Sequence, residues 1–365
     1  MTSMFRGHQI ARTSKVAAAG LTLALALAAC GSESSTSSGT ATSGPGPKLA
    51  ATLNASGSTF QKNLEENAIA AFTQANPGVT INYAGGGSAK GKQDLADKLV
   101  DFAGTDSPVK PEDLGKFKGA ALLYFPVAAA PIAVVYNLDG VSGLKLSGPT
   151  IAKIFQGDIK TWNDPAITAE NSGVTLPNTA ITIVHRSDGS GTTNNFAKFL
   201  VKSADGVWKL DKGDTLSWPK NSVGAEKNTG VANAVAQTKG AIGYVDFADA
   251  KKASLAMASV KNAAGEFVAP SLDGASKAVA ASQIAADLTF APADASGAGV
   301  YPITAPTWIL VYAKQSDAAK GNALKGYLQY LLTDGQKLAP TVDYAPLPTE
   351  LATKATDQLA KLQIG

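Results

Sequence analysis

Four short segments of the chain combine glycine with serine or threonine, a composition suited to binding an oxyanion. Each lies between a run predicted as strand and a run predicted as helix, so its backbone N–H groups would lie at a helix N-terminus, where anions bind readily. Glycine lets the backbone approach a ligand, and a hydroxyl adds a donor. One such segment is usually only a cap or a turn, but four together indicate an anion site. The segments are residues 56–60, 85–88, 104–108 and 186–193.

Other chemistry is poorly supported by the sequence. Residues 86–93 read G-x-x-x-x-G-K-Q, and Gln93 stands where a nucleotide-binding P-loop needs serine or threonine for Mg²⁺. His185 is the only histidine after the N-terminal region, and on an extended segment it would face away from Arg186. The residues around Ser190 do not form the G-x-S-x-G nucleophile elbow. The histidine count excludes a histidine-rich zinc site. No acidic cluster predicts another metal, and we expect no cofactor.

Strand and helix patterns alternate along the chain and would position these segments. Residues 126–136 form a continuous apolar run, which predicts a strand buried on both faces. The alternation indicates an α/β protein with mainly parallel sheets. Further strands are predicted at 79–83, 180–184, 241–245 and 307–312, and helices at 61–74, 150–156, 194–201, 229–237 and 317–332.

The N-terminal region has the layout of a bacterial secretory signal. Three basic residues precede an apolar run over 16–29 that is too short for a membrane span. The run ends in Leu-Ala-Ala-Cys, as in a lipobox, and Cys30 is the only cysteine, so it cannot form an internal disulfide. We predict a signal peptide at 1–29, then a lipidated Cys30 and a flexible Ser/Thr/Gly/Pro tether over 30–48. An ordinary cleaved signal with an incidental cysteine is the alternative.

Charge and length set further bounds. The chain has 32 lysines and arginines against 29 acidic residues, and three of the basic residues lie in the predicted signal peptide. The mature chain would therefore carry no net charge, which argues against nucleic acid as a partner. The residues after the tether are enough for two domains of ordinary size.

Taken together and in order, the segments resemble the bacterial phosphate-binding proteins, the PstS-like lipoproteins that act as substrate receptors of high-affinity phosphate ABC transporters. The resemblance covers residues 53–348, nearly the whole predicted folded part. A single motif would be weak, but the ordered set is specific. The motifs are GSTF at 57–60, YAGGGS at 83–88, VDFAGTDSP at 100–108 and RSDGSGT at 186–192, supported by KTWND at 160–164, GAIGYV at 240–245 and DYAPLP at 343–348.

The resemblance implies a two-lobed periplasmic-binding-protein (Venus flytrap) fold, in which each lobe is a twisted, mainly parallel sheet flanked by helices. One lobe would hold residues 49–128 and 300–365, and the other residues 129–299. Crossing strands near Pro126 and 302–307 would form the hinge. The implied function is that of a receptor and not an enzyme. It would be a monomer, anchored by lipid at the extracytoplasmic face of the cell membrane, that binds inorganic phosphate and delivers it to an ABC permease for import.

The resemblance also implies which residues bind the ligand. Matching motif by motif places the phosphate contacts on Thr59, Phe60, Ser88, Asp106, Arg186, Ser190, Gly191 and Thr192. Two further residues would support them, Ser58 and Asp188, the second being the acidic partner of the arginine.

These residue types suit a protonated oxyanion. Arg186 can offer two parallel N–H donors, and Asp188 can orient it and offset its charge. Asp106 suits phosphate because hydrogen phosphate and dihydrogen phosphate carry a proton that can be donated to a carboxylate. Sulfate carries none and would be repelled, so Asp106 would select against it.

Two alternative functions stay open at this point. An exported phosphatase could use the same cleft, although neither metal ligands nor a nucleophile–base pair is apparent. A receptor of the same kind could instead bind sulfate or molybdate, against which Asp106 argues.

Overall fold

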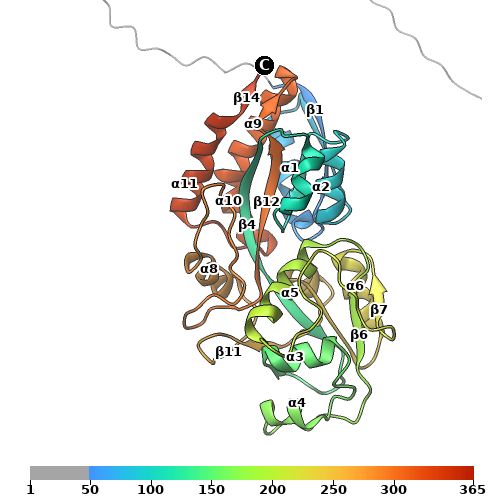
Figure 1. Ribbon diagram of the computed structural model, residues 1–365. Helices are drawn as coiled ribbons and strands as arrows, with labels where there is room; N and C mark the ends of the chain where they lie inside the picture. The colour runs from blue at the N-terminus through green and yellow to red at the C-terminus, as the bar shows by residue number, and fades with distance from the viewer. Residues whose placement is uncertain (1–48) are drawn as a thin grey trace, which may run out of the picture. The chain divides into compact units, whose positions relative to one another are not determined.

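A fifteen-residue strand, β4 (Leu122–Tyr136), runs through both lobes of the protein (Figure 1). The computed structural model describes residues 49–365, so the predicted signal peptide, Cys30 and the tether lie outside the described residues. Up to Pro131, β4 pairs antiparallel with β12 (Thr304–Tyr312). From Ile132 onward it pairs antiparallel with β8 (Ala241–Asp246). One strand therefore belongs to two sheets in succession, which confirms the two-lobed α/β fold.

In the first lobe the strand order is β2 (Val79–Gly85), β1 (Ala51–Gly57), β3 (Phe102–Thr105), β12 and β4. Strand β1 pairs in parallel with β2 and with β3, whereas β12 is antiparallel to both of its neighbours, β3 and β4. Helices pack against its parallel strands: α1 (Lys62–Ala75) against β2, α2 (Ser88–Ala96) against β1 and β3, and α9 (Ala318–Leu332) against β1. Helix α11 (Thr349–Asp357) packs against α9 and β4.

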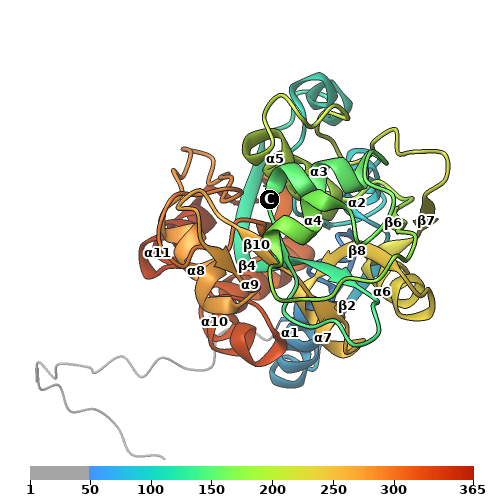
Figure 2. The same ribbon diagram turned by 90° about the horizontal axis from the view of Figure 1, so that it is seen from below.

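In the second lobe the order continues as β4, β8, β6 (Thr182–Arg186) and β7 (Val223–Ala225), with β6 parallel to both neighbours. The helices α5 (Gly191–Ser203) and α6 (Lys227–Gln237) pack against these strands. Helices lie on either side of these strands when the molecule is viewed from below (Figure 2). Successive residues of β8 face opposite sides: Tyr244 packs against Phe196 of α5, and Val245 packs in a separate cluster with Val235 of α6. This lobe also contains the helices α3 (Gly148–Phe155) and α7 (Phe247–Lys252).

The crossing between the lobes is irregular. The pairing register of β4 and β12 shifts between Thr307 and Trp308, which face Ala128 and Pro126. A bulge of this kind bends a strand locally, and proline supplies no N–H to the ladder. Both features lie where the hinge is expected. The division of the lobes at 128/129 and 299/300 stays a prediction.

Most predicted elements are present, with two differences. The segment 104–108 is not followed by an α-helix: Pro111 begins a short 3₁₀ helix, η1 (Pro111–Phe117). The prolines at 108 and 111 explain this, because residues before proline are disfavoured in the α region. Several helices were not predicted: α8 (Leu272–Ala280), which packs on the crossing strands, and also α4 (Pro165–Glu170), α7 (Phe247–Lys252), α10 (Asp334–Leu338) and α11 (Thr349–Asp357). None of the helices within residues 49–365 is long and apolar enough to span a bilayer.

Candidate functional site

The four glycine-containing segments meet where strands of both lobes end. Residues 56–60 follow β1, residues 85–88 join β2 to α2, and residues 104–108 follow β3. From the second lobe, residues 186–193 join β6 to α5. Carboxyl ends of parallel strands in an open α/β sheet commonly form ligand sites. The strand–helix design expected for the segments is therefore present in three of the four.

Asp106 lies at the centre of the first lobe's contribution and is almost fully buried. Its Oδ1 accepts hydrogen bonds from Ser58 Oγ (2.7 Å) and Thr307 Oγ1 (2.7 Å), and its Oδ2 accepts from Ser58 Oγ (2.6 Å) and Ser88 Oγ (3.2 Å). Burial raises the pKa of Asp106 to about 6, although these hydrogen bonds and the charge of Arg186 act in the opposite direction. The carboxyl group is thus an acceptor that several hydroxyls hold in place.

Arg186 is the last residue of β6, and its side chain is 1% exposed. Its Nε donates to Asp188 Oδ1 (2.7 Å), and its Nη2 forms an ion pair with Asp188 Oδ2. Burial acts to raise the pKa of Asp188, but the hydrogen bond and charge of Arg186 outweigh it, and the pKa is lowered. Nη1 lies 3.4 Å from Thr192 Oγ1. The guanidinium is therefore buried, and Asp188 fixes its orientation through the Nε–Nη2 edge.

The start of α5 supplies the other second-lobe residues. Ser190 caps this helix, and its Oγ accepts from the backbone N–H of Thr193 (3.1 Å). A serine hydroxyl that accepts in this way keeps its own proton for a ligand. The side chains of Ser190 and Thr192 are fully buried. They lie at the positive end of the helix macrodipole, which favours an anion.

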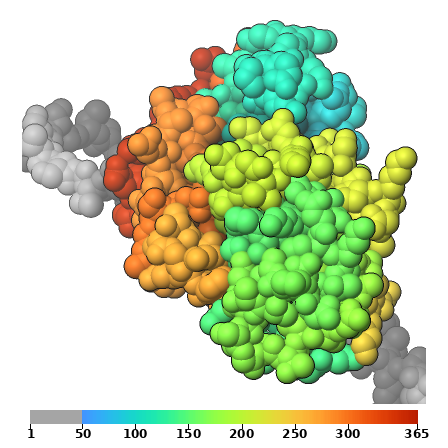
Figure 3. Space-filling model, turned by 60° about the horizontal axis from the view of Figure 1, so that its bottom comes forward, coloured from blue at the N-terminus to red at the C-terminus, as the bar shows by residue number. Residues whose placement is uncertain are grey.

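The two lobes touch at the site. Asn195 Nδ2 of α5 donates to the backbone oxygen of Asp106 (2.6 Å), and the N–H of Ala89 donates to Gly189 O (3.1 Å). A Cβ added to Gly191 would lie 2.5 Å from Ser88 Oγ and 2.7 Å from Asp106 Oδ2. Only glycine allows this approach. Figure 3 shows residues of the first lobe, in cyan, packed directly against residues of the second, in yellow-green.

Thr59 and Phe60 complete the predicted set. Thr59 Oγ1 is 3.3 Å from Asn228 Nδ2 of the second lobe. The Phe60 ring packs edge-on against Tyr344, away from the polar groups, so only its backbone faces them. Its N–H donates to Ser58 Oγ (3.0 Å). All eight predicted contacts thus belong to one cluster, with Ser58 and Asp188 beside them.

Sequence reasoning missed three residues of this cluster: Asn195, Asn228 and Thr307. Each contacts a predicted residue through a side chain that is almost fully buried. Asparagine and threonine carry no distinctive pattern at these positions. The only signal was that Asn228 immediately precedes a predicted helix.

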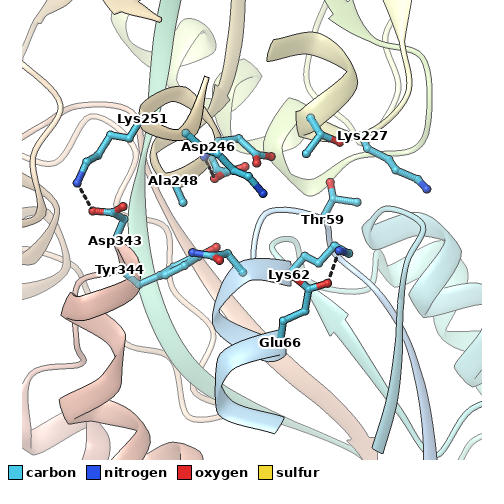
Figure 4. A pocket seen from close by; sticks show the side chains of 13 residues that line it. Thr59, Lys62, Glu66, Lys227, Asp246, Ala248, Lys251, Asp343 and Tyr344 are labelled. Atoms are coloured by element: carbon cyan, nitrogen blue, oxygen red, sulfur yellow. Dashed lines mark hydrogen bonds and ion pairs between the residues drawn. The ribbon is translucent and has the colours of Figure 1, made fainter. Parts of the chain in front are cut away.

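A cavity of about 500 Å³ opens beside the cluster, between α1 and α7 (Figure 4). Thr59 is the only predicted contact among its lining residues. An ion pair of Lys251 with Asp343 joins the two lobes at its edge. Burial, and then the charge of Asp249, raise the pKa of Asp246 on its wall well above the ordinary value. The other predicted contacts lie beneath the surface, as expected for a closed cleft.

In the part of the chain that the structure describes, the surroundings of His185 and the grouping of metal-ligating side chains bear on catalytic and metal chemistry. His185 stacks on Trp218 (ring centroids 4.9 Å apart), and its Nδ1 hydrogen-bonds to the backbone oxygen of Arg186 (2.9 Å). It therefore points away from the cluster, as its position next to Arg186 predicts. Within residues 49–365, His, Asp and Glu do not gather in threes in a way that could hold a metal ion.

Comparisons with known proteins identify the family of this chain. Residues 32–335 match the family described as the PBP superfamily domain. The phosphate-binding protein PstS of Xylella fastidiosa is 39% identical over 306 residues, which cover 82% of this chain and 82% of that protein. The phosphate-binding protein PstS 3 of Mycobacterium leprae is 37% identical over 318 residues, or 83% of this chain and 85% of that protein.

Solved structures share the fold. The periplasmic phosphate-binding protein PfluDING, solved with bound phosphate, superposes with a TM-score of 0.71 at 23% identity, covering 86% of this chain and 96% of that one. A phosphate-binding protein from Stenotrophomonas maltophilia gives a TM-score of 0.68 at 21% identity, covering 84% and 93%.

Proposed function

Because this chain belongs to the family of phosphate-binding proteins PstS, within the PBP superfamily, we propose that it binds inorganic phosphate in the cluster around Asp106 and Arg186. It is a receptor of a phosphate transport system and not an enzyme, as membership of this family implies. The observation that carries the proposal is the pairing of a buried guanidinium with a buried acceptor carboxylate in one cluster of hydroxyl donors.

This pairing suits phosphate better than other oxyanions. The arginine and the start of α5 offer charge and donors to the unprotonated oxygens. Asp106 would accept the proton that hydrogen phosphate retains near neutral pH. Sulfate and molybdate lack that proton. An oxygen of either anion would therefore face the carboxylate oxygen without a hydrogen bond and would be repelled by it. Burial strengthens the discrimination because water cannot screen the repulsion.

The finer parts of the function are proposals as well. Contacts from both lobes support a ligand that stabilises a closed cleft, as in a receptor that presents its cargo to a membrane permease. The lipobox supports a lipid anchor at Cys30 on the extracytoplasmic face. The balanced charge of the mature chain argues against nucleic acid as a partner, and the monomeric state is proposed from the resemblance alone.

Calorimetric titration of ligand-stripped protein tests the proposal. Phosphate should bind at one equivalent, arsenate should compete because it is protonated in the same way, and sulfate should bind far more weakly. Stripping by unfolding and refolding is needed because a buried site retains its ligand on purification. Equal affinity for sulfate and phosphate, or hydrolysis of a model phosphomonoester by the same sample, would overturn the proposal.

A further inference from the structure

Asn228 is a fully buried amide in the first turn of α6 that contacts hydroxyls of both lobes. Its Nδ2 lies 3.3 Å from Thr59 Oγ1 of the first lobe and 3.2 Å from Thr192 Oγ1 of the second. An amide nitrogen has two protons and can donate to both oxygens at once. Two of the predicted phosphate contacts are thus joined through one side chain that was not predicted.

These bonds decide where the threonine protons point. A threonine hydroxyl has one proton and two lone pairs. When Oγ1 accepts from Asn228, its own proton must be directed elsewhere. Thr192 Oγ1 is also within 3.4 Å of Arg186 Nη1, so donors face both of its lone pairs. Its proton is then free only for a further acceptor, such as an oxygen of a bound anion.

The orientation of the amide group is supported by its surroundings. In the orientation described, one acceptor, Oδ1, has no partner within residues 49–365. The opposite orientation would place Oδ1 against both threonine oxygens and leave two buried N–H protons unpaired. It would also draw both hydroxyl protons away from the anion. Buried groups are almost always paired, so the first orientation costs less.

We propose that Asn228 is a positioning residue for phosphate: it fixes the Thr59 and Thr192 hydroxyls as donors to the ligand. The inference rests on the proposed function, because it takes phosphate as the ligand. In this arrangement Asp106 accepts a hydrogen bond from the ligand, whereas the Thr59 and Thr192 hydroxyls donate hydrogen bonds to it. It also links the lobes, because the bond to Thr59 exists only when they are closed.

A double-mutant cycle tests the inference. Asn228→Ala frees both hydroxyls to rotate and should weaken phosphate binding about tenfold, the loss of roughly one hydrogen bond. Thr192→Val removes one hydroxyl with little change in shape. If Asn228 acts through that hydroxyl, the two losses in binding free energy should not add, and the double variant should bind clearly better than their sum predicts. Additive losses in folded proteins would overturn the inference.

A second variant tests the direction of the protons. Asn228→Asp replaces the donor with an acceptor and should turn both hydroxyl protons away from the ligand, weakening binding more than Asn228→Ala does. Added negative charge contributes too, so the same change is made with Thr192→Val, whose side chain has no proton to turn. The effect of Asn228→Asp should be smaller in that background. Wild-type affinity in Asn228→Asp would overturn the inference.

Asn171→Asp is the matched control. Asn171 is another buried asparagine of the second lobe, and its Nδ2 donates to the backbone oxygens of Lys145 (2.8 Å) and Ile167 (2.9 Å). Its change should lower the thermal unfolding midpoint without altering phosphate affinity. If the unmutated protein binds no phosphate, the proposed function fails. If it binds phosphate but the cycle is additive, only the role of Asn228 fails.

Discussion

At the scale of single residues, Arg186 stands out because it is the only arginine after residue 12. All other basic side chains of the described residues are lysines or the one histidine. Lysine gives solubility at the surface, whereas the planar guanidinium can bind an oxyanion through two parallel bonds. The chain therefore places its single arginine where geometry as well as charge is needed.

Removing this arginine should weaken binding strongly. Loss of one partner of a buried charge pair costs about 2–5 kcal/mol, so Arg186→Ala should reduce phosphate affinity by roughly 30-fold or more, at about 1.4 kcal/mol per tenfold. The phosphate affinity of Arg186→Lys should lie between those of the unmutated protein and Arg186→Ala, because lysine keeps the positive charge but lacks the two parallel N–H donors. Calorimetry would measure all three proteins. Lys62→Ala, which alters a lysine that lines the cavity and pairs with Glu66 of its own helix, is the control, and an equal loss there would contradict the assignment.

Asp106 should make sulfate rejection depend on pH. Its pKa is raised to about 6 by burial, so lowering the pH through 6 protonates the carboxyl group. A protonated Asp106 no longer repels sulfate and can donate to it. Sulfate affinity should therefore rise below pH 6 in the unmutated protein. Asp106→Asn should bind sulfate at every pH, with the selectivity ratio collapsed even if phosphate still binds. Unchanged rejection of sulfate by Asp106→Asn would show that cleft size or the hydroxyls discriminate instead.

At the scale of elements, a buried carboxyl group lies between α1 and α9. Glu65 is fully buried, and its Oε2 accepts from Tyr327 Oη (2.8 Å). Burial raises its pKa to about 7, although the hydrogen bond from Tyr327 acts in the opposite direction. Between pH 4.5 and 7 the unfolded chain loses this proton while the folded protein keeps it. Its contribution to stability is therefore present below pH 4.5 and is lost as the pH rises to 7.

Glu65→Gln should remove this pH dependence. At pH 4.5 the variant and the unmutated protein should have similar unfolding free energies. At pH 8 the variant should be more stable, by on the order of 3 kcal/mol at most, since each pKa unit corresponds to about 1.4 kcal/mol. Denaturant unfolding at both pH values measures the difference. Glu66→Gln, at an exposed ion pair with Lys62, should show no such trend, and a difference independent of pH at Glu65 would contradict the explanation.

Elements were more predictable from sequence than contacts. The apolar run over 126–136 and the alternation over 79–83 predicted β4 and β2 because burial of a strand depends on its own residues. Helix α8 was missed because its pattern, rich in alanine, is weak until it packs on the crossing strands. Asn228 was missed because its contact with Thr192 depends on how α5 and α6 pack in the second lobe, and its contact with Thr59 depends on how the lobes close.

At the scale of the whole molecule, the side chain of Asp214 joins the lobes at the edge of the ligand cluster. Its Oδ2 is 2.8 Å from Lys92 Nζ and its Oδ1 accepts from Ser107 Oγ (2.8 Å), both in the first lobe. Asn194 of α5 also donates to Oδ1 (3.0 Å). The pair of Asp214 with Lys92 is largely buried. The side chain of Asp214 therefore stabilises the closed arrangement, while its backbone oxygen accepts from the N–H of Ser190 (2.8 Å), a predicted ligand contact.

Phosphate should shift this protein from an open to a closed state. Small-angle scattering should give a smaller radius of gyration with phosphate than after stripping. Asp214→Ala should need more phosphate to reach the closed value, because a less populated closed state lowers the apparent affinity. Lys239→Ala, at an exposed ion pair with Asp139, is the control. Identical profiles with and without phosphate would contradict hinge closure, provided that calorimetry shows the stripped sample to be empty.

The predicted anchor is tested on whole cells. Cys30→Ser removes the thiol that would carry the lipid and should release the protein from membranes into the medium. Fractionation followed by immunoblotting measures the distribution. The unmutated protein is the reference, and a variant that is processed and retained on the membrane as before would show that Cys30 is not the anchor.

The path of the chain through the two lobes has a consequence for its synthesis. All strands of the second lobe precede β12, whereas the sheet of the first lobe has β3 at an open edge until β12 arrives. During synthesis the second lobe can therefore fold before the last strand of the first lobe, β12, and the helices α9 and α11 have been made. An unpaired edge invites association with other chains. The lobe that begins first is completed last, so its safe assembly depends on the C-terminal residues following without delay.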